Sequence, residues 1–100
     1  MSTPEKIVRP EKCVRVVIKG WVQGVGYRAD CRYEAQRLGL AGWVRNRGYG
    51  SVEALLAVPA PAVDEMVRWC AHGPANAEVS GIEVTEALEE PVGRSFNIRY

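Results

Sequence analysis

The chain has 100 residues, of which 47% are hydrophobic and 25% charged, and its formal net charge is +1. This length allows one domain with a single two-layer core, and it excludes a cofactor domain beside a substrate domain. The near-neutral charge excludes a large electrostatic field for nucleic acid or an anionic membrane, so any preference for anions must be local.

Residues 1–12 lack hydrophobic periodicity, and we expect a flexible N-terminal lead-in before a domain that spans residues 13–100. The lead-in is charged and contains two prolines, unlike a secretory signal. The longest apolar run, residues 54–62, is interrupted by Pro59 and Pro61 and is too short to span a bilayer. Together these features predict a cytoplasmic protein.

The domain opens with an alternating pattern in which Val14, Val16 and Ile18 share one face, as in a central strand. Three glycines then mark a loop: Gly20, Gly24 and Gly26. Residues 27–38 follow helical spacing and end before Gly39, a typical helix stop. The apolar positions of this helix are Cys31, Ala35 and Leu38.

Two strands over residues 41–46 and 51–58, joined by a glycine-rich turn, are predicted to form a hairpin. Pro61 can open a second helix, with Asp64 and Glu65 in its first turn and Gly73 after its end. The apolar stripe of this helix has the spacing i, i+3, i+4, i+7: Val63, Met66, Val67 and Cys70.

Alternating residues predict a fourth strand over residues 82–86 and a fifth over residues 96–100. The order strand, helix, strand, strand, helix, strand is that of two split βαβ units, with one further strand at the end. We therefore predict an α+β fold, a ferredoxin-like sandwich with an antiparallel sheet and two helices on one face.

The segment GWVQGVGYR, residues 20–28, joins a buried strand to the first turn of a helix. Free N–H groups and the helix dipole concentrate there, glycines allow close approach of a ligand, and Arg28 adds a forked cationic donor. This pattern indicates an anion cradle formed by Gln23, Gly24, Val25, Gly26, Tyr27 and Arg28. A plain glycine-rich turn with an exposed arginine is the alternative. Nucleotide fingerprints do not fit, because neither the ribose-binding acidic residue nor the Lys-Ser/Thr pair follows.

Residues 20–28, together with GLAGWVRNRGYGSV at residues 39–52, resemble the two signature stretches of acylphosphatases. The resemblance extends from residue 14 to residue 100. It implies that the amides of residues 23–28 and the Arg28 side chain bind phosphate, and that Asn46 orients the attacking water. Trp21 stands where many relatives have arginine, and Tyr27 replaces a common phenylalanine, for which we expect a packing role under the loop.

The resemblance implies hydrolysis of an acyl phosphate to a carboxylate and inorganic phosphate, with Arg28 and Asn46 as the catalytic residues and no cofactor or metal. The leaving carboxylate needs no strong general acid, so position and charge suffice. By pattern alone Asn46 is also a common turn residue. His72, the only histidine, is expected to be a solvated helix cap. The three cysteines, Cys13, Cys31 and Cys70, are expected to be buried and reduced, because their spacing suits neither disulfides nor zinc.

A non-catalytic phosphate-sensing or RNA-binding module of the same fold is the main rival, although the predicted central strands lack the aromatic residues that stack on RNA bases. A detached relative of the acylphosphatase-like domain of hydrogenase-maturation proteins is another. The expected partners are a small acyl phosphate substrate and inorganic phosphate or another anion. We expect a monomer that binds neither nucleic acid nor membrane.

Overall fold

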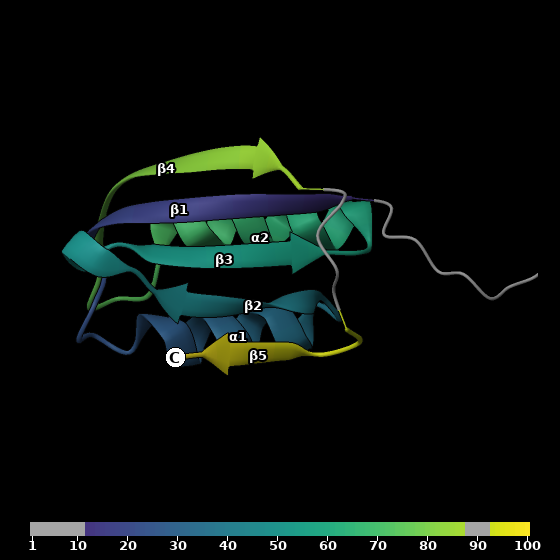
Figure 1. Cartoon of the computed structure of the whole chain (residues 1–100), viewed down its shortest axis with the longest axis horizontal. Helices are drawn as coiled ribbons and strands as arrows, with labels where there is room; N and C mark the ends of the chain where they lie inside the picture. Colours follow the sequence, from purple (N-terminus) through teal and green to yellow (C-terminus); the bar gives the residue numbers. More distant parts are fainter. Residues whose placement is uncertain (1–11, 88–92) are drawn as a thin grey trace, which may run out of the picture.

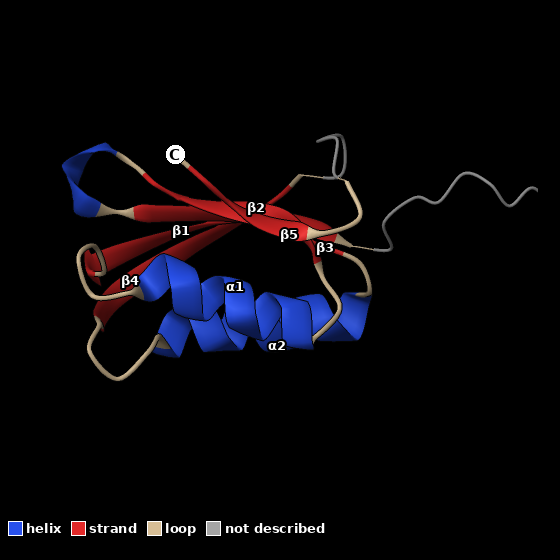
Figure 2. Ribbon diagram, turned by 90° about the horizontal axis from the view of Figure 1, so that it is seen from below, coloured by secondary structure: helices blue, strands red, loops and turns tan. Residues whose placement is uncertain are grey.

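The computed structural model describes residues 12–87 and 93–100. Both helices cover one face of a five-stranded sheet with the order β4-β1-β3-β2-β5 (Figures 1 and 2), which confirms the predicted ferredoxin-like α+β sandwich. The elements are β1 Cys13–Trp21, α1 Tyr27–Arg37, β2 Ala41–Asn46, the 3₁₀ turn η1 Gly48–Gly50, β3 Val52–Ala57, α2 Ala60–His72, β4 Glu78–Glu86 and β5 Phe96–Arg99. Apart from Lys12, the predicted lead-in lies outside the described residues.

One strand pairing differs from the prediction, because β5 runs parallel to β2 and the sheet is therefore mixed. The other three pairings are antiparallel. The reason lies in the connection. Strand β4 lies at one edge of the sheet and runs antiparallel to β1. The chain then passes to the opposite edge, where β5 runs in the same direction as β1 and β2 (Figure 1). An antiparallel partner for β2 would require the chain to cross the length of the sheet first.

The main core lies between the sheet and the two helices. The inward residues of β1, Val14, Val16 and Ile18, are all buried, as their alternation predicts. Helix α1 buries Tyr27, Cys31 and Ala35, and α2 buries Val63, Met66 and Cys70. The three cysteines are buried, as predicted. Removal of this apolar surface from water is the main favourable contribution to folding.

The ends of several elements differ from the prediction. Strand β1 continues through Gly20, where a bulge shifts the register against β4, instead of ending at residue 19. The φ angle of Gly20 is 125°, and an added Cβ would lie 2.1 Å from the carbonyl oxygen of Glu78, so only glycine fits this bulge. Strand β4 is longer than predicted and begins at Glu78.

The predicted acidic first turn of the second helix is wrong. Helix α2 begins at Ala60 after an N-terminal cap at Pro59, so Asp64 and Glu65 lie one turn further along. Pro61 does stand within the first turn, where its missing N–H costs nothing. At the other end, Gly73 terminates α2 with a φ of 75°, and Gly39 follows α1 with the same φ, as predicted for both helices.

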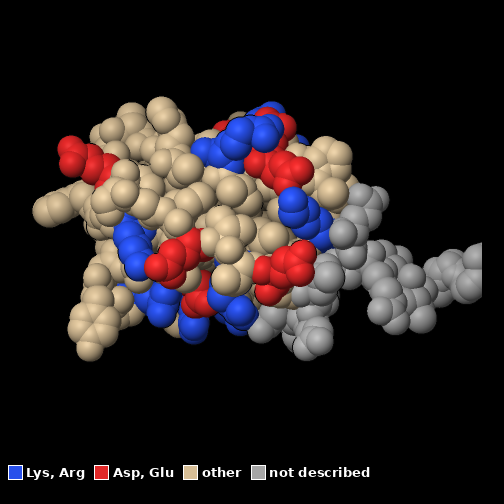
Figure 3. Space-filling view, turned by 90° about the horizontal axis from the view of Figure 1, so that it is seen from above, with Lys and Arg blue, Asp and Glu red and all other residues tan. Residues whose placement is uncertain are grey.

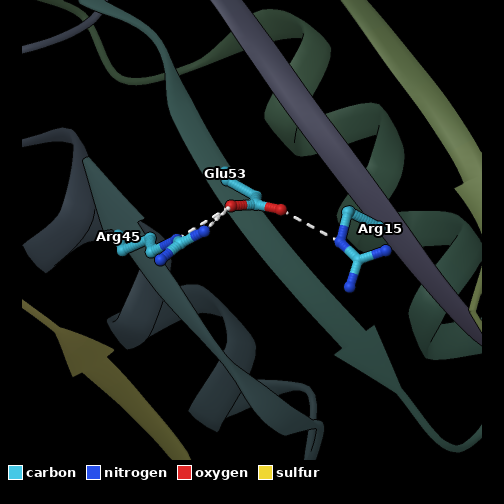
Figure 4. Close-up of polar contacts among 3 residues, drawn as sticks. All are labelled: Arg15, Arg45 and Glu53. Carbon is cyan, nitrogen blue, oxygen red and sulfur yellow. Dashed lines mark hydrogen bonds and ion pairs between the residues drawn. The ribbon is translucent and has the colours of Figure 1, made fainter. Parts of the chain in front are cut away.

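The sheet face opposite the helices carries a buried charge. Glu53 on β3 is only 7% exposed, and it lies between two arginines from the neighbouring strands (Figure 4). Its carboxylate accepts from Arg45 Nε at 2.8 Å and pairs with Arg15 Nε at 2.9 Å. This cluster ties β1, β3 and β2 together across the outer face.

Strand β4 forms one edge of the sheet, and most of its side chains are exposed. Figure 3 views the molecule from this side and shows acidic and basic side chains interspersed over the surface. The strand itself carries three carboxylates, Glu78, Glu83 and Glu86. Lys19 of β1 pairs with Glu83 at 2.7 Å and, as the nearest cation, holds the pKa of that carboxyl below its usual value.

Candidate active site

The bend between β1 and α1 has the geometry of an anion cradle. Gly24 and Gly26 take φ angles of 76° and 80°, which side chains with a Cβ rarely adopt. Gly26 is the N-terminal cap of α1, and the first helical hydrogen bond joins the Asp30 N–H to the Gly26 carbonyl at 3.1 Å. The N–H groups of residues 27–29 therefore have no partner within the helix and can bind an anion.

A cavity of about 230 Å³ opens at this bend. It brings together the two residues that were predicted to be catalytic, Arg28 on α1 and Asn46 at the end of β2. Its lining consists of Val22, Gly24, Gly26, Tyr27, Arg28, Ala29, Asn46, Ile98 and Tyr100. One wall thus offers backbone amides, a guanidinium and a side-chain amide, and the other is apolar.

The apolar wall comes from the end of the chain. Tyr100 directly follows β5, and its ring lies 5.1 Å from the Arg28 guanidinium carbon, within the range of a cation–π contact. Ile98 on β5 is half-buried beside it. The sequence reasoning missed both residues as part of the site. The signal that could have pointed to them is the family resemblance, which extends through residues 97–100, but it carried no role for these residues.

Two residues of the predicted cradle direct their side chains elsewhere. Val25 packs against the main core. The Gln23 amide nitrogen donates to the carbonyl oxygens of Arg47 and Ser51, at 2.7 and 2.8 Å. Any contact of these two residues with a bound anion would therefore come from their backbone N–H groups.

Tyr27 packs under the bend, as predicted. Its side chain is 1% exposed, its ring lies 5.3 Å from that of Trp69, and its hydroxyl donates to the Cys70 carbonyl at 2.9 Å. Burial raises the pKa of the Tyr27 phenol far above its usual value, and the neighbouring thiols of Cys70 and Cys31 add to this shift. The hydroxyl therefore stays neutral and lies in the core.

Other candidate groups lie away from the cavity. His72 is exposed at the end of α2, where a helix cap was expected. Within residues 12–87 and 93–100, no three His, Cys, Asp or Glu side chains are grouped so that they could hold a metal ion. None of the described helices is both long and apolar enough to cross a lipid bilayer.

The fold and the site together define a small ferredoxin-like sandwich in which a glycine-containing bend before α1 shares a cavity with a side-chain amide from the end of β2. The acylphosphatase family model matches residues 14–98. An acylphosphatase from Rubrobacter xylanophilus is 50% identical over 91 residues, which cover 91% of this chain and 83% of the relative. An acylphosphatase from Azoarcus is 59% identical over 70 residues, or 70% of this chain and 71% of the relative. This chain belongs to the acylphosphatase family.

Solved structures agree with this assignment. The crystal structure of acylphosphatase from Bacillus subtilis has a TM-score of 0.83 and 38% identity, and the match covers 88% of this chain and 98% of that one. Full-length HypF, in its phosphate- and nucleotide-bound form, shares the fold with a TM-score of 0.76 and 23% identity, but the match covers only 12% of HypF. The family predicted from the two motifs is confirmed, and its members are enzymes that hydrolyse acyl phosphates.

Proposed function

We propose that the cavity between the bend and β2 is where this chain hydrolyses acyl phosphates, with Arg28 and the bend amides binding the phosphoryl group and Asn46 placing the water. The observation that carries this assignment is the shared cavity. Gly24, Gly26, Arg28 and Asn46 come from two separate motifs, and all four line the same space.

The phosphoryl group suits the polar wall of the cavity. A loose transition state spreads negative charge over the equatorial phosphoryl oxygens. Preorganised N–H groups at the start of α1 and the Arg28 guanidinium can follow that charge without reorganising. The stacking of Arg28 on Tyr100 limits the rotamers of a long side chain, which lowers the entropy lost on binding.

The attacking water suits Asn46. Its side-chain carbonyl accepts a hydrogen bond and its NH₂ group donates one, so the amide can orient a water molecule without removing a proton. The water oxygen bonds to phosphorus as the bond between phosphorus and the acyl oxygen breaks. The carboxylate leaves with that electron pair, and the water proton passes to a phosphoryl oxygen, which supplies the base that the described site lacks.

We further propose that the protein works as a cytoplasmic monomer whose domain spans residues 13–100. Cys31 and Cys70 are buried and form no disulfide within the part of the chain that the structure describes, which suits a reducing compartment. Arg28 and Asn46 line the same cavity within one copy, so the proposed reaction calls on no residue of a second copy.

The test is hydrolysis of benzoyl phosphate by the purified protein in the presence of a chelator, followed by phosphate release. Arg28→Gln should abolish turnover and weaken inhibition by inorganic phosphate, because the anion loses its permanent charge partner. Asn46→Ala should lower turnover to a small residual rate and leave phosphate inhibition nearly unchanged. Arg32→Gln is the matched control, because Arg32 lies one turn further along α1 and outside the cavity. Full activity of Asn46→Ala would contradict the role of Asn46 in placing the water.

A further inference from the structure

We propose that Gln23 is a positioning residue that couples the two halves of the site by holding the hairpin loop after Asn46 against the bend before Arg28. The inference rests on the proposed role of Asn46 and goes beyond it, because it assigns the Gln23 side chain to the hairpin and not to the phosphate. Gln23 lies in the bend itself and is half-buried.

Both protons of the Gln23 amide can be assigned to the hairpin. Its nitrogen lies 2.7 Å from the Arg47 carbonyl oxygen and 2.8 Å from the Ser51 carbonyl oxygen. An NH₂ group has two protons, so these two bonds use its full donor capacity. The same two residues are joined by a backbone bond from the Arg47 N–H to the Ser51 carbonyl at 2.8 Å. The amide therefore bridges the two ends of the turn.

Asn46 depends on its neighbours for its position. Within the described part of the chain, its own side chain makes no hydrogen bond, and it is exposed to the cavity. The preceding residue, Arg45, is held by Glu53 on the outer face at 2.8 Å (Figure 4). The following residue, Arg47, is held by Gln23. Asn46 thus sits between two anchored residues, and only the second anchor comes from the phosphate-binding bend.

The turn itself needs this second anchor. Its tip is Gly48-Tyr49-Gly50, in which Tyr49 takes a φ of 64° and is fully exposed. A non-glycine residue in this region of φ is disfavoured, and two flanking glycines give the backbone many other conformations. Without the Gln23 amide, the turn would be held by its own backbone alone: the Arg47–Ser51 bond, the 3₁₀ turn η1 and the pairing of Asn46 with Val52. The end of β2 would then sample other backbone conformations, and these would displace Asn46.

The coupling matters because transfer to phosphorus is sensitive to position. A displacement of about 1 Å in a catalytic group can lower the rate about 100-fold. Gln23 belongs to the bend proposed to bind phosphate, and its side chain donates hydrogen bonds to the turn after Asn46. One side chain therefore sets the distance between the phosphate and the attacking water. The expected signature is a loss of turnover without a loss of phosphate affinity.

Gln23→Met is the direct test, because methionine has a similar length and cannot donate. We expect kcat for benzoyl phosphate to fall about 10- to 100-fold, with the inhibition constant of inorganic phosphate changed by less than about threefold. Gln36→Met is the matched control. Gln36 also donates its amide to a backbone carbonyl, that of Phe96 at 3.1 Å, but it lies outside the cavity, so kcat should stay within about twofold of the unaltered protein.

A double-mutant cycle separates positioning from direct catalysis. If Gln23 acts through Asn46, adding Gln23→Met to Asn46→Ala should change the residual turnover by less than about twofold. A further loss of about tenfold in that background, or full activity of Gln23→Met alone, would overturn the inference while the proposed hydrolysis still stood.

The heteronuclear ¹⁵N NOE of residues 46–51 tests the anchor without any turnover. We expect lower values in Gln23→Met than in the unaltered protein, and unchanged values in Gln36→Met. Failure of the unaltered protein to hydrolyse acyl phosphates would refute the proposed function. An unchanged NOE in Gln23→Met would overturn the anchoring role of Gln23, whatever the turnover assay shows. Should Gln23→Met not fold, Gln23→Glu also lacks the donors and can be judged by the NOE alone.

Discussion

Replacement of Tyr27 by phenylalanine should weaken the fold and leave the chemistry intact. The Tyr27 hydroxyl donates to the Cys70 carbonyl at 2.9 Å, and that carbonyl lies in the last turn of α2. The residue four positions later is Pro74, which has no N–H, so Cys70 cannot be satisfied by the next turn of the helix. The hydroxyl therefore fills a gap in the backbone hydrogen bonding.

The expected loss of unfolding free energy in Tyr27→Phe follows from the burial of Tyr27 and Cys70. Both residues are fully buried, so loss of the hydroxyl leaves the Cys70 carbonyl unsatisfied, at a cost of about 1–3 kcal/mol in unfolding free energy. For a domain of this size, each kcal/mol lowers Tm by roughly 4–8 °C. Turnover at low temperature should be unchanged, because the hydroxyl lies in the core on the Cys70 carbonyl, and the proposed role of Tyr27 in phosphate binding involves only its backbone N–H.

The assay is thermal and urea unfolding of Tyr27→Phe beside the unaltered protein, with benzoyl phosphate turnover measured well below both Tm values. Retained stability would refute the reasoning about the orphan carbonyl. Lost turnover in a folded variant would show instead that the phenol takes part in the reaction.

The same residue predicts a pH dependence. Because the pKa of Tyr27 is raised in the folded state, the folded protein keeps this proton above pH 10 while the unfolded chain loses it. The associated stability is complete below the ordinary tyrosine pKa of about 10 and declines above it, by up to about 1.4 kcal/mol per pH unit. Tyr27→Phe should show a shallower decline, and an identical decline in both proteins would contradict this assignment.

Two further predictions concern the sheet. Gly42→Ala should abolish folding, as seen by loss of the far-UV circular dichroism of the native protein, because φ is 135° and a Cβ would lie 1.8 Å from the Leu55 carbonyl oxygen; a folded variant would contradict this geometry. Glu53→Ala should lower the unfolding free energy in urea by about 2–3 kcal/mol, because Arg15 and Arg45 lose a shared partner at a buried position, and a change below about 0.5 kcal/mol would mean that solvent compensates for the loss.

Local periodicity accounts for the elements that sequence reasoning predicted well. The alternation of Val14, Val16 and Ile18 and the stripe of Val63, Met66 and Cys70 each record one buried face, because a side chain repeats its direction every two residues in a strand and every 3.6 in a helix. The tight bend at Gly24 and Gly26 was predicted for the same reason, since glycines before a helix start form a local feature.

The features that were missed depend on contacts between distant parts of the chain. The parallel pairing of β5 with β2 follows from the return of the chain across the sheet, and it is this pairing that brings Ile98 and Tyr100 to the cavity. The Gln23 side chain could equally have faced an anion, and its actual partners lie in a hairpin more than twenty residues away. Local sequence gave no sign that Glu53 is buried, because its two arginine partners come from separate strands.

The exposed edge of β4 affects how copies of this protein associate in a crowded solution. The outer edge of this nine-residue strand has no neighbouring strand in the described sheet, and such an edge is a template onto which a second chain can add. Here Glu78, Glu83 and Glu86 recur along that template, so two copies that approach edge to edge would place carboxylates of like charge near one another. Salt screens exposed charges, so this repulsion weakens as ionic strength rises, and self-association of the native fold should first appear at high salt.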